Sequence, residues 1–238
     1  MFFYQNYLLF FLFAIPGLLL GLYARSRVNS AFKKYSKVRT LRNLTGAQVA
    51  RSLLDAEGLY DVVVEESDGF LSDHYDPRHR VLRLSKDVYH QPSVASAGVA
   101  AHEMGHAMQH AGGYIPLQFR SALVPAAKFG SNLAPLIFMA GLMLSLFISS
   151  EIGIAIAWVG VGIFAVAVMF TLITLPVEFN ASRRAKVLLK SSGTLISNEE
   201  YEGVNKVLDA AALTYVAAAV AAIGQLLYYV FILTGRRR

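Results

Sequence analysis

The chain contains no cysteine among its 238 residues. Disulfide bonds and thiolate ligands are therefore excluded, and any metal ion must be held by histidine, aspartate or glutamate. The lack of cysteine does not identify a cellular compartment. The sequence also shows no internal repeat.

Charge is missing from four long stretches of the chain. Hydrophobic residues make up 55% of the sequence, and the mean hydropathy of +0.45 is too high for a soluble domain of this length. Each stretch is long enough to cross a bilayer, so we predict a mainly α integral membrane protein with about four transmembrane helices. The stretches are residues 7–24, 129–150, 152–177 and 210–235.

The first stretch is not a typical signal peptide, because no basic residue precedes it and seven follow it. The positive-inside rule places this basic flank in the cytoplasm and the N-terminus outside. The flank either binds anionic headgroups or acts only as a topology signal. Arg236–Arg238 oppose this topology, since four spans would put them outside, but the larger cluster outweighs them. The seven residues are Arg25, Arg27, Lys33, Lys34, Lys37, Arg39 and Arg42.

The turn between the second and third stretches is marked only by Ser149, Ser150, Glu151 and Gly153, which predicts a helical hairpin that returns the chain to its starting side. We expect small residues to let its helices pack closely, namely Gly141, Gly160 and Gly162. We expect prolines to break the preceding segment, namely Pro116, Pro125 and Pro135.

Residues 45–118 are more polar. Their pattern predicts a helix over 45–56, a short strand at Val62–Val64 and a β-hairpin. The hairpin pairs Gly69–Tyr75 with His79–Ser85 around the turn signal Asp76-Pro77. A further helix follows, with Ser93 as its N-cap and Gly112-Gly113 as its stop.

This last helix carries His102-Glu103-Met104-Gly105-His106, a match to the H-E-x-x-H motif. Histidines four positions apart on a helix can both reach one metal ion, and Glu103 can face the attacking water as general base. The helix is otherwise apolar, so burying these groups unpaired would cost free energy that a metal ion removes.

A catalytic zinc ion with two histidine ligands needs a third protein ligand and one open position. Glu178 ends the third apolar stretch and is expected to start a helix on the same side as His102. Alternative ligands are Asp73, Asp76 and Asp87.

The remaining histidines are not expected to bind this ion. His110 lies eight positions after His102, about 12 Å along a straight helix, so it is predicted to be structural or to support a ligand. His74, His79 and His90 are expected at the surface or in hydrogen bonds.

Other polar residues are candidates for supporting the centre. Asn180, Ser182, Arg183 or Arg184 could orient Glu178 or bind a developing oxyanion. The arginines could equally anchor the chain at the cytoplasmic surface. We also expect an exposed strand edge to pair with an extended substrate, formed by Val81, Leu82, Arg83 and Leu84.

His102–His106 and Glu178–Ser182 together resemble the two signature pieces of membrane gluzincins. The second piece resembles the E-F-x-A-D pattern of the HtpX and CAAX-prenyl endopeptidase group, except that Ser182 stands where aspartate is usual. The whole chain more closely resembles bacterial membrane zinc metallopeptidases of the YugP type. That resemblance implies zinc held by His102, His106 and Glu178, with Glu103 as base. The matching segments are Thr45–Ala47, Leu71–Pro77, Leu84–Ser85, Ala101–His110 and Leu175–Ser182.

We therefore predict a multi-pass plasma-membrane endopeptidase with one Zn²⁺ per chain and a small α+β zincin-like part on the cytoplasmic side. Its substrate is a peptide or membrane protein, and no nucleic acid is expected.

A non-catalytic metal-binding adaptor and a transporter subunit are alternatives. A structural site needs no base such as Glu103, and a transporter would need ionisable groups within its spans. The predicted organisation is transmembrane helix 1 at 1–24, the zincin-like part at 25–128, the hairpin at 129–177, a helix with the third ligand at 178–209, and transmembrane helix 4 with its basic tail at 210–238.

Overall fold

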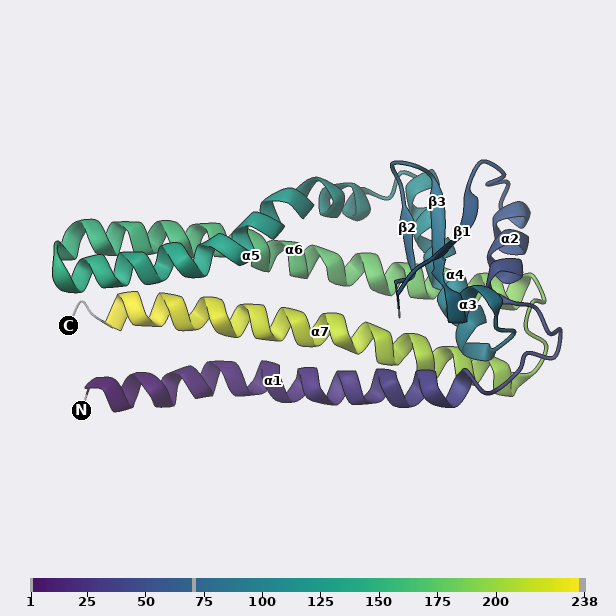
Figure 1. Ribbon diagram of the computed structural model, residues 1–238, viewed down its shortest axis with the longest axis horizontal. Helices are drawn as coiled ribbons and strands as arrows, with labels where there is room; N and C mark the ends of the chain where they lie inside the picture. Colours follow the sequence, from purple (N-terminus) through teal and green to yellow (C-terminus); the bar gives the residue numbers. More distant parts are fainter. Residues whose placement is uncertain (1, 70–71, 236–238) are drawn as a thin grey trace. The chain divides into compact units, whose positions relative to one another are not determined.

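The computed structural model describes residues 2–69 and 72–235 (Figure 1). Leu71 and the Arg236–Arg238 tail, on which parts of the prediction depend, lie outside the described residues. The chain divides into two compact units. The span unit comprises residues 1–23, 119–175 and 215–238, and the sheet unit comprises residues 24–118 and 176–214.

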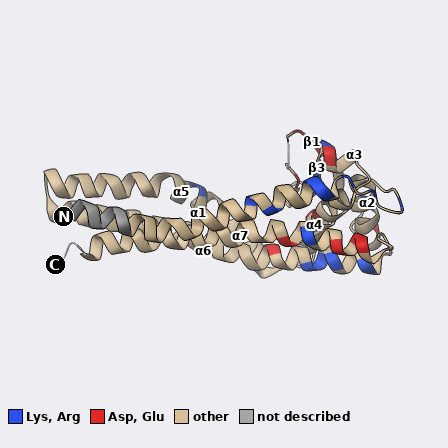
Figure 2. Cartoon of the chain, turned by 90° about the horizontal axis from the view of Figure 1, so that it is seen from below, with Lys and Arg blue, Asp and Glu red and all other residues tan. Residues whose placement is uncertain are grey.

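Four described helices are long and apolar enough to cross a membrane. The predicted fold class, a mainly α membrane protein with about four spans and a small α+β part, is thereby confirmed. Figure 2 shows long stretches of these helices without a charged residue, as the composition requires. The helices are α1 (Phe2–Tyr35), α5 (Ile115–Phe147), α6 (Ser150–Ser191) and α7 (Asn198–Gly235).

Within the span unit, α5 and α6 form the expected hairpin, with its turn between Phe147 and Ser150. A Cβ atom added to Gly160 would lie 2.7 Å from the amide nitrogen of Phe138, so the two backbones are in direct contact there. Gly141 makes a similar approach to Ala157. The prediction for Gly162 is wrong, because an added Cβ would meet nothing within 4 Å.

The prolines do not break α5 as predicted. Pro125 and Pro135 lie inside one continuous helix, and Pro116 is its second residue. A proline within a helix removes one hydrogen bond and bends the axis, which neighbouring helices can tolerate. Figure 1 shows that α5 is bent along its length.

The sheet unit contains three strands in the order β1-β3-β2. The predicted hairpin of β2 and β3 is present, and β1 adds to the other side of β3 in parallel, which the sequence pattern did not reveal. The predicted substrate edge at Val81–Leu84 is therefore wrong. These residues belong to the central strand, whose hydrogen-bonding groups face β1 and β2. The strands are β1 (Val63–Ser67), β2 (His74–Asp76) and β3 (Val81–Ser85).

Three helices of the sheet unit pack against this sheet. They are α2 (Gly46–Ala56), α3 (Lys86–His90) and α4 (Val94–Ala111). Thr45 forms a capping box with Gln48, and Ser93 caps α4 by accepting a hydrogen bond from the Ser96 amide, as predicted for Ser93. The helix α4 ends at the predicted glycines, with Gly113 at φ 62°. The unit has one continuous core, which includes Leu53, Leu82, Met104, Leu189 and Leu208.

Glu178 does not start a helix, contrary to the prediction. The helix α6 continues without a break from Ser150 to Ser191, through Pro176 and Glu178. The change from apolar to polar sequence near Glu178 therefore marks a change of environment along one helix rather than a helix end.

Two glycines of α6 allow a matched test of the hairpin contact. We expect Gly160→Ala to destabilise the protein by about 1–3 kcal/mol, the usual cost of overpacking, because its Cβ has no room against α5. The control Gly162→Ala should leave stability unchanged. Thermal unfolding in detergent measures both, and equal midpoints for the two variants would contradict the packing.

Candidate metal centre

The helix α4 places His102 and His106 one turn apart on the same face, with ring centroids 4.9 Å apart. Most of α4 is buried, including Ala101, Met104 and Ala107. The two imidazoles retain slight exposure, with side chains 13% and 10% accessible. A pair of imidazoles that is mostly buried but still accessible suits a site that must admit a small ligand.

The C-terminal part of α6 packs directly on α4. A Cβ atom on Gly105 would lie 2.5 Å from the carbonyl oxygen of Ala181, so only glycine allows this approach. The contact lies between the two histidines on α4 and between Glu178 and Ser182 on α6. Gly105, the fourth residue of the motif, thus lets α6 bring its polar side chains to both histidines.

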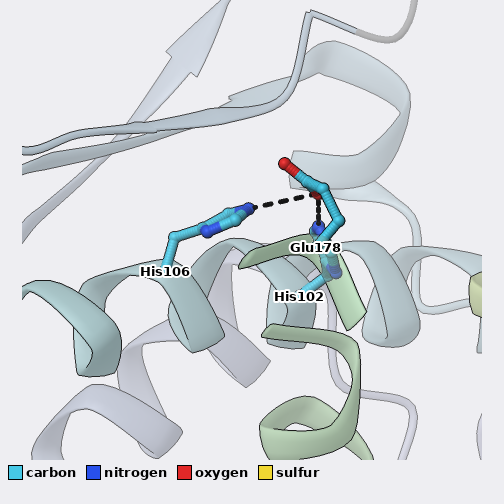
Figure 3. A group of neighbouring side chains, drawn as sticks. All are labelled: His102, His106 and Glu178. Atoms are coloured by element: carbon cyan, nitrogen blue, oxygen red, sulfur yellow. Dashed lines mark hydrogen bonds and ion pairs between the residues drawn. The ribbon is translucent and has the colours of Figure 1, made fainter. Parts of the chain in front are cut away.

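Glu178 reaches both histidines with one oxygen, Oε2, which lies 3.1 Å from His102 Nε2 and 3.5 Å from His106 Nε2 (Figure 3). The three potential ligand atoms lie within 4.8 Å of one another. Ligand atoms about 2 Å from a tetrahedral zinc ion are about 3.3 Å apart. The donor types and their spacing therefore fit a zinc ion held by two histidines and one carboxylate.

The other nitrogen of each histidine is also hydrogen-bonded. His102 Nδ1 lies 3.1 Å from Ser182 Oγ, and His106 Nδ1 lies 3.0 Å from Gln109 Oε1. Asn180 and Arg184, which sequence reasoning placed near the site, join this arrangement through Gln109. Gln109 itself was missed, although a lone amide in an apolar helix three residues after His106 was a usable signal.

Carboxylates shift the pKa values of two groups in this region. Burial lowers the pKa of His106, but the hydrogen bonds to Glu178 and Gln109 and the charges of Glu103 and Glu178 together outweigh burial and hold that pKa above its usual value. Burial raises the pKa of Asp73, and the nearby Glu103 carboxylate adds to this, against hydrogen bonds from Ser85. Glu103 is buried and follows His102 directly in the sequence of α4.

The structure does not bring the alternative carboxylates into the group. Among the described residues, the potential metal-binding group consists of His102, His106 and Glu178. Asp73 accepts hydrogen bonds from Ser85, and Asp76 pairs with His79 and Arg83. Asp87 lies in the first turn of α3.

The remaining histidines also have other partners. His110 Nδ1 is 2.9 Å from the Tyr75 hydroxyl, which ties α4 to β2. His90 Nε2 is 2.6 Å from Glu66. His74 is exposed, with Nδ1 2.8 Å from the Ser72 carbonyl oxygen.

Comparisons with known proteins identify the family of the chain. The family model described as "Putative neutral zinc metallopeptidase" matches residues 10–234. The chain belongs to this family of zinc metallopeptidases, which confirms the resemblance found in the sequence. It is 48% identical over 230 residues to the "Putative membrane protease YugP" of Bacillus subtilis (strain 168), covering 96% of this chain and 99% of that relative. No solved structure matches the chain.

Removal of any one of the three converging side chains should remove the metal. We expect His102→Ala, His106→Ala and Glu178→Gln to lose bound zinc, because two remaining ligands hold the ion too weakly. The matched control His90→Ala removes an exposed histidine and should keep it. Elemental analysis of the purified variants measures zinc per chain. Full zinc in the Glu178→Gln variant would exclude Glu178 as a ligand.

Proposed function

We propose that the protein is a zinc-dependent endopeptidase with His102, His106 and Glu178 as metal ligands, one zinc ion per chain and Glu103 as general base. The observation that carries the proposal is the convergence of the three ligand side chains, with the buried Glu103 next to His102 in the sequence. Membership of a zinc metallopeptidase family supports the same activity.

A bound Zn²⁺ would polarise the scissile carbonyl and lower the pKa of a water molecule at the site. Glu103 accepts the proton of that water and later delivers it to the leaving amine. Ser182 and Gln109 hold the histidine rings in the orientation that presents Nε2 to the ion.

The roles of base and ligand can be separated by two isosteric changes. Glu103→Gln should keep bound zinc and lose about 10²–10⁴-fold in peptidase activity, the usual contribution of a general base. Glu178→Gln should lose both. Casein or a quenched peptide library serves as substrate, and zinc content is measured on the same samples. An active Glu103→Gln variant would point instead to a metal that serves only structure.

We further propose that the sheet unit lies on the cytoplasmic side of the plasma membrane. The seven basic residues that follow the first span support this orientation through the positive-inside rule. The same orientation would put the α5–α6 turn outside.

Because the chain has no cysteine, single cysteines report topology without background. We expect Ser192→Cys, in the sheet unit, to resist a membrane-impermeant maleimide in whole cells. Ser150→Cys, at the α5–α6 turn and also exposed, should react. The reverse pattern would place the candidate site outside the cell.

A further inference from the structure

One buried amide contacts both helices that carry the proposed ligands. Gln109 is fully buried on α4, three residues after His106. Its Oε1 lies 3.0 Å from His106 Nδ1, and its Nε2 donates to the carbonyl oxygen of Val177 at 2.8 Å and to Asn180 Oδ1 at 3.0 Å. Val177 and Asn180 flank Glu178 on α6. One side chain therefore hydrogen-bonds a histidine on one helix and two residues close in sequence to the proposed carboxylate ligand on the other.

The directions of these hydrogen bonds follow from the chemistry of the groups. Arginine is a donor only, and Arg184 Nε donates to Asn180 Oδ1 at 2.8 Å. Asn180 must therefore present its oxygen, and Gln109 must meet that oxygen with its NH₂ group. The Val177 carbonyl can only accept a hydrogen bond, so it requires the same orientation of the Gln109 amide. Both contacts exclude the flipped amide.

The orientation of Gln109 then decides which nitrogen of His106 carries hydrogen. With its NH₂ facing α6, Gln109 has only its oxygen to offer His106, so Nδ1 must be the donor. Nε2 is left to face Glu178 and the candidate metal position. Ser182 imposes no such direction on His102, because a hydroxyl can either donate or accept.

We propose that Gln109 is a positioning residue that keeps hydrogen on Nδ1 of His106 and fixes Glu178 beside it, with its own orientation set by Val177 and by Arg184 acting through Asn180. This rests on the proposed metal centre for its functional consequence. Loss of a residue that orients a ligand typically weakens metal binding about 10–100-fold.

Direction of hydrogen bonding separates this role from simple packing. Gln109→Met preserves approximate size but makes no such bonds, and should raise the zinc dissociation constant about 10–100-fold.

Asn180 acts only as an acceptor, so Asn180→Asp should bind zinc as tightly as the parent protein, whereas Asn180→Leu should weaken binding. Arg184→Met should also weaken binding, and its neighbour Arg183, which is exposed, gives the matched control Arg183→Met without effect.

Two readouts test the proposal on the full chain in detergent. Competition with a chromophoric chelator gives the zinc dissociation constant. Imidazole ¹⁵N chemical shifts show which ring nitrogen carries hydrogen when they are recorded at alkaline pH, where the ring is neutral; the His106 signal is identified by its loss in His106→Gln. We expect Nδ1 to be protonated with and without zinc in the parent, in Asn180→Asp and in Arg183→Met, and a mixture of the two forms in metal-free Gln109→Met.

Unchanged zinc affinity and Nδ1 protonation in Gln109→Met would overturn the proposal, as would equal behaviour of Asn180→Asp and Asn180→Leu. If Gln109→Met does not fold, the comparison of Arg184→Met with Arg183→Met tests the proposal instead, because Arg184 is only partly buried. Failure of the metal centre itself is distinguishable. In that case the parent binds no zinc, while the ¹⁵N shifts of the metal-free protein still report the tautomer of His106.

Discussion

The close contact of α4 and the C-terminal part of α6 at Gly105 and Ala181 determines the geometry of the candidate centre. Side chains at this contact can meet only because no Cβ separates the two backbones. The contact brings a carboxylate within 3.1 and 3.5 Å of two imidazole nitrogens. A wider separation would leave Glu178 facing an apolar core, where an unpaired charge is very unfavourable. The polar residues around the contact therefore depend on one another for their polar partners.

The burial of so many polar groups in one place has a physical reason. Glu178 is 2% exposed, and Gln109 is fully buried. Each would cost free energy if left without a partner. Glu178 contacts both histidines, and Gln109 hydrogen-bonds His106, the Val177 carbonyl and Asn180. Such a network specifies one arrangement of the helices, which a purely apolar contact would not. A rigid arrangement is also what a catalytic metal requires of its ligands.

The sequence predicted the parts of the structure that depend on local pattern. Uncharged stretches predicted the four long helices, and capping residues such as Ser93 predicted where α4 begins. The parallel pairing of β1 with β3 was not predicted, because no local sequence pattern shows which strands pair when a connection separates them. For the same reason β3 was mistaken for an edge. Glu178 was mistaken for a helix start because hydropathy changes there, although hydropathy reports environment and the backbone continues unchanged.

We propose that two imidazoles and one carboxylate from the sheet unit hold a single zinc ion. X-ray absorption at the zinc edge of the purified full chain tests it directly, since imidazole rings give distinctive multiple scattering. We expect two imidazole nitrogens and two oxygen ligands, one from Glu178 and one from water, at about 2.0–2.2 Å. A centre with three imidazoles, or with oxygen ligands alone, would contradict it.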